Sequence, residues 1–335
     1  MSSPTIPQQH RPLGVFHPTH VVHQRAHWSS RNWRKHRYPP GHAPAGSGSE
    51  WWTHDHGAVK RTTRLSGDIS FWLAVVFVVG SIAWVINGFL LLLPILSPSK
   101  YPEHFTAASA FAFIGGTVFE VGSYLMFVEA LNAGHDELFG EALKGEIDKL
   151  ESRPQKKDVR FRWWYVSPIF GVNQVTEKLA VRGSTSWRNL GFLASSIQLV
   201  AATVFWISTL TGLPGVIPGL PDDPPIAISD VFYWTPQVIG GLGFVISSTL
   251  LMLEVQRAWW RPKLNSLGWY VGLFNLIGAI GFTLCGALGY AALSSSKAEY
   301  QSTLSTFWGG WAFLIGSGVQ LWESVWRDVD HDENN

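Results

Sequence analysis

The sequence predicts an all-α membrane protein in which six transmembrane helices form three tandem helical hairpins. Three observations carry this prediction: six long apolar stretches, an alternating charge distribution between them, and a short motif that recurs in every second stretch. Charged residues make up only 15% of the 335 residues, whereas a soluble domain has about 25%. A large soluble helical protein is therefore disfavoured.

The six apolar stretches approach or exceed the roughly 20 residues that a helix needs to cross a bilayer. Most carry no charge in their interior, whereas a buried helix of a soluble protein is shorter and keeps a polar stripe. The predicted spans are residues 70–95, 107–131, 189–211, 232–254, 268–292 and 304–325.

The charges between the spans predict one orientation. Cations are concentrated in the N-terminal tail, in the segment 134–188 and just after the fourth span. The segment 213–230 has no cation and three aspartates. Because cytosolic loops carry the excess of Lys and Arg, both termini are expected in the cytosol and each hairpin turn outside.

The even-numbered spans share a motif of two glycines, then a phenylalanine, a serine and a glutamate at fixed spacing. Its copies occupy residues 115–129, 240–254 and 309–323. Composition gives a chance copy odds on the order of one in a thousand, so three copies indicate a repeat. The odd spans align on Ile82, Ile197 and Ile280, each preceded by two small residues. Two spans per copy give the repeats the same, parallel orientation.

The motif predicts where helices pack closely. At 100° per residue, Gly116, Phe119 and Ser123 fall within about 60° on one helix face. Small residues let a second helix approach, and serine can hydrogen-bond across the contact. We interpret this face as a packing seam, with a ligand groove as the alternative. Its residues are Gly116, Ser123, Gly241, Ser248, Gly310 and Ser317.

The glutamates that end the three motifs are Glu129, Glu254 and Glu323. They lie roughly 20 Å further along the helix than the glycines and about 140° around it. This places them at the cytosolic boundary. They are expected to be interfacial carboxylates, with their heads in water or paired with a cation such as Arg257 or Arg327.

Glu120 is the ionisable side chain predicted deepest in the membrane, and its repeat equivalents are Val245 and Leu314. A charge at that depth is costly, so the carboxyl should be protonated, paired or turned to a polar space. One hypothesis is a proton or small-solute site, and the other is a neutral glutamate that binds a neighbouring helix. The other candidates for such an intramembrane polar site are Asn87, Gln198, Asn275 and Gln320.

Several chemistries are disfavoured. The single cysteine, Cys285, leaves no intrachain disulfide and no cysteine-based metal site. Nine of the 12 histidines lie in the first 56 residues and none in a predicted span, which disfavours a haem held between helices. No nucleotide, hydrolase or metalloprotease motif occurs. We expect no catalytic residue, no metal, no cofactor and, at a net charge of +1, no nucleic-acid partner.

The chain divides into six predicted regions. The tail 1–66 is expected to be disordered because it is rich in Pro, Gly, Ser and Arg. The loop 134–186 is expected to contain an amphipathic helix that lies on the membrane or recruits a protein partner. The remaining regions are the hairpins 67–133, 187–256 and 257–327 and an acidic tail, 328–335.

The last motif copy carries a family resemblance, in the run Gly309-Gly310-Trp311-Ala312-Phe313-Leu314-Ile315-Gly316-Ser317. This run is similar to the signature of the YrhK-like two-helix membrane domain. Residues 67–327 also resemble a group of uncharacterised fungal integral membrane proteins, most clearly at 235–256 and 304–325. The resemblance implies a membrane location and a fold of small hairpins, and it brings no catalytic residues.

From the sequence, the favoured function is a non-catalytic membrane scaffold, because apolar spans and glycine seams are what a scaffold requires. The first alternative is a proton or small-solute transporter or channel that uses Glu120. The second is a membrane-embedded enzyme that acts on lipid, with the interfacial carboxylates as its candidates. The lipid bilayer is the expected environment in each case.

Overall fold

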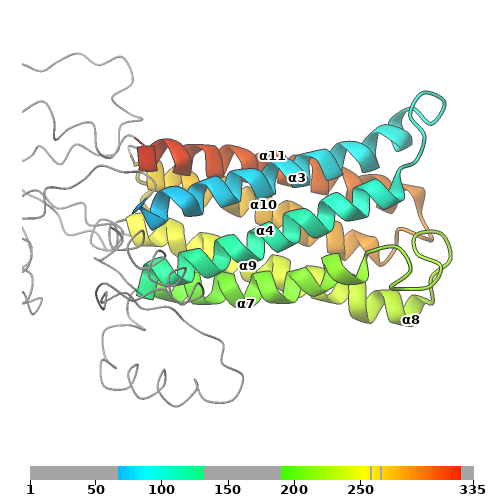
Figure 1. Cartoon of the computed structure of the whole chain (residues 1–335), viewed down its shortest axis with the longest axis horizontal. Helices are drawn as coiled ribbons and strands as arrows, with labels where there is room; N and C mark the ends of the chain where they lie inside the picture. The colour runs from blue at the N-terminus through cyan, green and yellow to red at the C-terminus, as the bar shows by residue number, and fades with distance from the viewer. Residues whose placement is uncertain (1–66, 132–189, 257–258, 265, 326–335) are drawn as a thin grey trace, which may run out of the picture.

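A computed structural model describes residues 67–131, 190–256, 259–264 and 266–325 (Figure 1). Within these ranges the chain is helical, with short turns and loops and no strand. The tails 1–66 and 328–335, the predicted amphipathic helix within 134–186, and both Arg257 and Arg327 lie outside the described residues.

Six long helices lie close to the predicted spans, and two short segments precede one of them. The chain turns through α8 (Ile226–Ser229) and a widened helical turn, η3 (Asp230–Trp234), directly into the fourth long helix. The hydroxyl of Thr235 donates to the carbonyl of Asp230 at 2.7 Å and bridges the widened turn. The long helices are α3 (Ile69–Leu96), α4 (Phe105–Leu131), α7 (Leu190–Thr211), α9 (Thr235–Val255), α10 (Leu267–Gly289) and α11 (Ser296–Val325).

Five helical segments are long and apolar enough to cross a membrane: α3, α4, α7, the continuous stretch 226–255, and α10. Helices of this length and apolar composition fit the interior of a lipid bilayer, which indicates a multi-pass membrane protein. The helix α11 is longer but more polar, because its buried face carries Ser302, Ser305, Thr306 and Gln320. The sixth span therefore stays a prediction.

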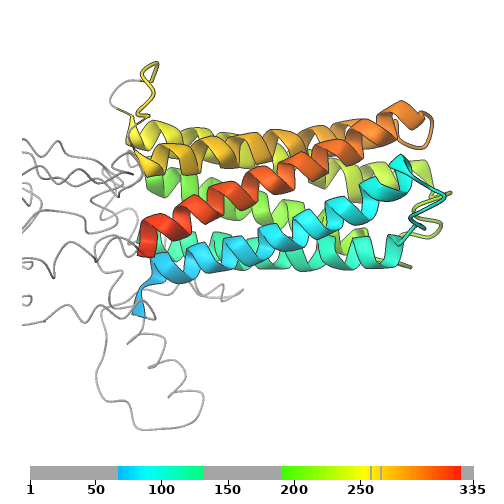
Figure 2. The same ribbon diagram turned by 90° about the horizontal axis from the view of Figure 1, so that it is seen from above.

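The six long helices form a closed ring. Each packs against the next in the order α3, α4, α7, α9, α10, α11, and α11 packs back against α3. The helices run side by side along the bundle in both views (Figures 1 and 2). The beginning of α3 and the end of α11 lie at the same end of the bundle (Figure 1).

The first glycine of each motif packs against an aromatic residue of the preceding long helix. A Cβ built on Gly115 would lie 2.8 Å from the indole nitrogen of Trp84, and one on Gly240 would lie 2.6 Å from the Phe205 side chain. One on Gly309 would lie 3.0 Å from the ring of Phe282. Trp84, Phe205 and Phe282 therefore occupy matching places against the first glycine of the three motifs.

The predicted alignment of the odd spans is therefore wrong in the second hairpin. Aligning Ile82 with Ile197 would pair Trp84 with Leu199, but the glycine contact selects Phe205, six residues later. In the contact-based alignment the two small residues are Ala201 and Ala202. Thr203 then corresponds to Ile82 and Ile280. Aligning the odd spans on a shared isoleucine was therefore misleading, because Ile197 is not the corresponding residue.

The second glycine of each motif packs between hairpins. A Cβ on Gly116 would lie 2.7 Å from Thr209 of α7, and one on Gly241 would lie 2.6 Å from Thr283 of α10. One on Gly310 would lie 3.2 Å from the backbone of Trp84 in α3. The predicted seam glycines thus lie at the three junctions that close the ring.

The variant Gly241→Ala should destabilise the bundle. The new Cβ would lie 3.0 Å from the backbone Cα of Thr283, so a side-chain rotation cannot relieve the crowding. Overpacking of this kind costs about 1–3 kcal/mol. Thermal unfolding in detergent measures the loss. Gly318→Ala is the matched control because nothing lies within 4 Å of its Cβ. Equal unfolding temperatures for the two variants would contradict the close junction.

A layer of aromatic rings closes the centre of the ring of helices. Three of them, Trp84, Phe205 and Phe282, come from alternate helices of the ring and contact one another. Their centroids are separated by 5.7 Å, 4.7 Å and 5.6 Å. We call these three the aromatic triangle. Each of the other three helices adds one buried ring to the same cluster: Phe119, Phe244 and Phe313.

Candidate functional site

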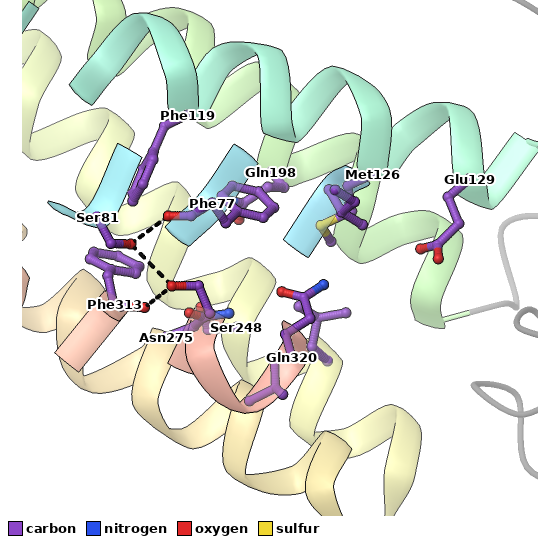
Figure 3. A pocket seen from close by; sticks show the side chains of 14 residues that line it. Phe77, Ser81, Phe119, Met126, Glu129, Gln198, Ser248, Asn275, Phe313 and Gln320 are labelled. Carbon is purple, nitrogen blue, oxygen red and sulfur yellow. Dashed lines mark hydrogen bonds between the residues drawn. The ribbon is translucent and has the colours of Figure 1, made fainter. Parts of the chain in front are cut away.

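A cavity of about 30 Å³ lies inside the bundle, between the aromatic layer and the end at which α3 begins. Phe119 and Phe313 bound it on one side, and Glu129 lies toward the opposite end (Figure 3). Every helix of the ring contributes a polar side chain to its wall. These are Ser81, Glu129, Gln198, Ser248, Asn275 and Gln320.

The side-chain amides of Gln198, Asn275 and Gln320 make the wall of the cavity polar. Gln198 and Gln320 are each only 8% exposed. Within the described part of the chain, the side chains of Gln198, Asn275 and Gln320 form no hydrogen bond. A buried amide without a partner costs free energy, so these groups require water or a polar ligand. Because a water molecule needs roughly 10–15 Å³ of such space, the cavity has room for about two.

The serines of the motif take three different roles. Ser317 lies 3.3 Å from Ser81, Oγ to Oγ, across the junction of α11 and α3. Each of these two hydroxyls donates to a carbonyl one turn earlier in its own helix, at 2.7 Å. Their lone pairs therefore remain as acceptors. Ser248 and Ser317 both line the cavity, whereas the hydroxyl of Ser123 is buried without a partner among the described residues.

Glu129 is held at the cavity by the start of α3. It is 1% exposed, and the hydroxyl of Ser70 donates a hydrogen bond to its Oε1. The backbone N–H of Ser70 donates in turn to Oδ1 of Asp68 at 2.9 Å, which caps α3. This chain of contacts fixes both the helix start and the carboxyl.

The three motif glutamates are buried, which contradicts the expectation of carboxylate heads in water. The alternative expectation, a pair with Arg257 or Arg327, falls on residues outside the described ranges. Glu254 and Glu323 are as enclosed as Glu129. Each motif helix packs against a neighbouring helix on both sides in the closed ring, and its glutamate is enclosed there. Of the three, Glu129 is the one that lines the cavity.

Glu120 lies away from the cavity. It is half-buried on the α4 side that faces α7, where its Oε1 lies 2.9 Å from the hydroxyl of Thr203. Its Oε2 is buried and has no hydrogen-bond partner among the described residues. One residue after Phe119 is a step of 100° around the helix, which turns Glu120 from the axis to the α4–α7 junction.

The other predicted polar residues separate into two groups. Asn87 is buried between α3 and α4, where its amide donates to the carbonyl of Ala108 at 2.8 Å. Gln198, Asn275 and Gln320 meet at the cavity. The structure thus brings three of the five candidates together and leaves Glu120 and Asn87 outside.

The predicted repeat carries a signal for this cavity that the predicted alignment of the odd spans did not reveal. In the contact-based alignment, Gln198 and Asn275 are equivalent to Phe77, and all three line the cavity. In the even helices, Gln320 is equivalent to Met126 and Leu251, which also line it. A correct alignment would have shown amides recurring at inward-facing positions.

In comparisons with known proteins, no family model, no curated protein and no solved structure matched the chain. The resemblance to YrhK-like and fungal membrane proteins therefore stays a prediction. Among the described residues, no group of three His, Cys, Asp or Glu side chains could hold a metal ion.

Proposed function

We propose that this chain is a six-span integral membrane protein that moves protons or other small cations along the axis of its bundle. The observation that carries the proposal is the cavity to which all six helices contribute a polar side chain. Polar and ionisable groups inside a membrane are costly, and they typically mark the path of an ion or a proton. A purely structural core would be more stable if these positions were apolar.

The proposed topology has three parallel hairpins and both termini in the cytosol. It is supported by the positive-inside pattern of the sequence and by the common end at which α3 begins and α11 ends. The equivalent glycine contacts of the three hairpins support the tandem repeat. In this orientation the cavity lies in the cytosolic half of the bundle.

The aromatic triangle closes the axis on the far side of the cavity. Its three rings are 1–5% exposed and pack edge to face or stacked. Transport in this proposal requires these rings to separate. The path runs through the cavity and not through Glu120, because Glu120 lies at the α4–α7 junction.

The second candidate function is a non-catalytic membrane scaffold. It is favoured by the aromatic layer, in which one ring from each helix closes the centre of the bundle. Close glycine packing at all three junctions would also give a scaffold the rigidity that it needs.

Ion flux across liposomes separates the two functions. We expect the reconstituted protein to dissipate a proton gradient faster than protein-free liposomes do. Glu120→Gln is expected to keep this flux because Glu120 lies outside the cavity. The assay should be repeated with sodium and potassium gradients. Flux at the protein-free level for all three cations would overturn the proposal and leave the scaffold.

A further inference from the structure

We propose that Glu120 lies in the interface of a homodimer, in which a second copy of this chain covers the outer surface of α4 and α7. The inference goes beyond the proposed function and is independent of it, because Glu120 lies outside the cavity. It assigns a role to the ionisable side chain nearest the middle of α4, which the transport path does not use.

The outer surface of α4 and α7 carries a polar pair among exposed aliphatic side chains. Two aliphatic side chains are exposed on each helix. On each helix they are seven residues apart, or two turns, so they share one side. Between them, the hydroxyl of Thr203 donates to Oε1 of Glu120 at 2.9 Å. We call this surface the α4–α7 face, and its residues are Ile114, Glu120, Val121, Val200, Thr203 and Ile207.

A single copy in a bilayer does not satisfy the Glu120 carboxyl. Thr203 is its one donor among the described residues, and Oε2 is buried without a partner there. Glu120 is only half-buried, so part of its side chain would face acyl chains, which offer no hydrogen bond. Ionisable side chains in membrane helices almost always face the inside of a bundle or a polar cavity. Because Glu120 does not line the cavity of its own bundle, we infer that a larger assembly encloses it.

The chemistry of the α4–α7 face fits a second copy of the same face. A protonated carboxyl both donates and accepts hydrogen bonds, so two of them satisfy each other across a two-fold axis. This arrangement brings no net charge into the membrane. Among the three motif helices, α4 alone has a carboxyl at this position, since α9 has Val245 and α11 has Leu314. Association through one such face closes as a dimer and does not extend into a chain.

The monomer–dimer equilibrium of Glu120 variants tests the interface. We expect the reconstituted wild type to be dimeric, as measured by energy transfer between labelled copies while added lipid dilutes them. Glu120→Leu should raise the dissociation constant about tenfold or more, because it removes the hydrogen bonds between the copies. Glu120→Gln should retain the dimer, since an amide also donates and accepts. Leucine fits this position because Leu314 occupies it in α11.

Thr203→Val provides a second variant that leaves the carboxyl in place. It removes the hydroxyl that donates to Glu120 and should also weaken the dimer. Thr249→Val is the matched control, because Thr249 is exposed on α9 and donates to the carbonyl of Val245 in its own helix. This control should associate as the wild type does.

Cross-linking locates the interface. Val200 is 66% exposed and lies one turn from Thr203 on the α4–α7 face. A residue near a two-fold axis meets its own counterpart, so Val200→Cys should form a disulfide between copies when an oxidant is added. Ile315→Cys, exposed on α11, should remain monomeric under the same conditions. The native Cys285 is buried and present in both variants.

The outcomes separate this inference from the proposed transport. A monomeric wild type overturns the dimer, and so does a dissociation constant that Glu120→Leu leaves unchanged. A disulfide at Ile315→Cys but not at Val200→Cys would assign the interface to another face and overturn the inference. The proposed path lies within one copy, so a dimer without ion flux retains the interface and overturns transport alone.

Discussion

The double variant Trp84→Ala, Phe282→Ala should convert the closed bundle into a leaky one. The two rings form the tightest contact of the aromatic triangle, with centroids 4.7 Å apart. Removing both leaves Phe205 as the one remaining ring of the aromatic triangle, beside a space large enough for water. We expect proton flux through the reconstituted variant to exceed that of the wild type by an order of magnitude or more.

The cost in stability can be separated from the gain in flux. Each truncation of a buried ring costs about 3–5 kcal/mol, so the single variants should be measured as well. Phe89→Ala is the matched control because Phe89 packs on Phe307 with centroids 4.9 Å apart but is 39% exposed on the outside of the bundle. Wild-type flux in a folded double variant would show that the triangle does not close the path.

Replacing Gln198, Asn275 and Gln320 with leucine together should stabilise the bundle and stop transport. Phe77, Met126 and Leu251 already line the same cavity, so apolar side chains fit this geometry. A buried polar group without a partner costs about 1–3 kcal/mol, and an apolar group of similar volume removes that cost.

Chemical denaturation and proton flux should be measured on the same preparations of this triple variant. Asn87→Leu is the control, because that amide is also buried but already donates to Ala108. Losing a satisfied buried hydrogen bond costs about 1–3 kcal/mol, so the control should be destabilised. A triple variant that is less stable than the wild type would contradict unpartnered amides, and retained flux would contradict their role in transport.

The helices could be predicted because membrane spans are read directly from the length of apolar stretches. The predicted spans 70–95 and 189–211 differ by one residue at one or both ends from α3 and α7. The widened turn at Asp230–Trp234 could not be predicted, because it depends on a local bond from Thr235 to the Asp230 carbonyl. The glycine pairs were also recognisable, since a residue without Cβ is needed where helices meet closely.

The candidate site was only partly predictable, because side-chain direction depends on how the hairpins close into a ring. Glu120 attracted attention by its depth, but a 100° step turned it to the α4–α7 junction. Glu129 was expected at the aqueous boundary, in water or paired with a cation, because it ends its helix, whereas the ring of helices buries it. The sequence shows how deep in the membrane a residue lies along its helix. Whether its side chain points to the bundle axis depends on how all the neighbouring helices pack.

An experimental density map of the reconstituted protein, at a resolution that shows water, tests whether the bundle holds a hydrated polar cavity on its axis. We expect one or two ordered water molecules within hydrogen-bonding distance of Gln198, Asn275 and Gln320, beside an intact aromatic triangle. A dry interior in which these amides bond to one another or to the helices would contradict it.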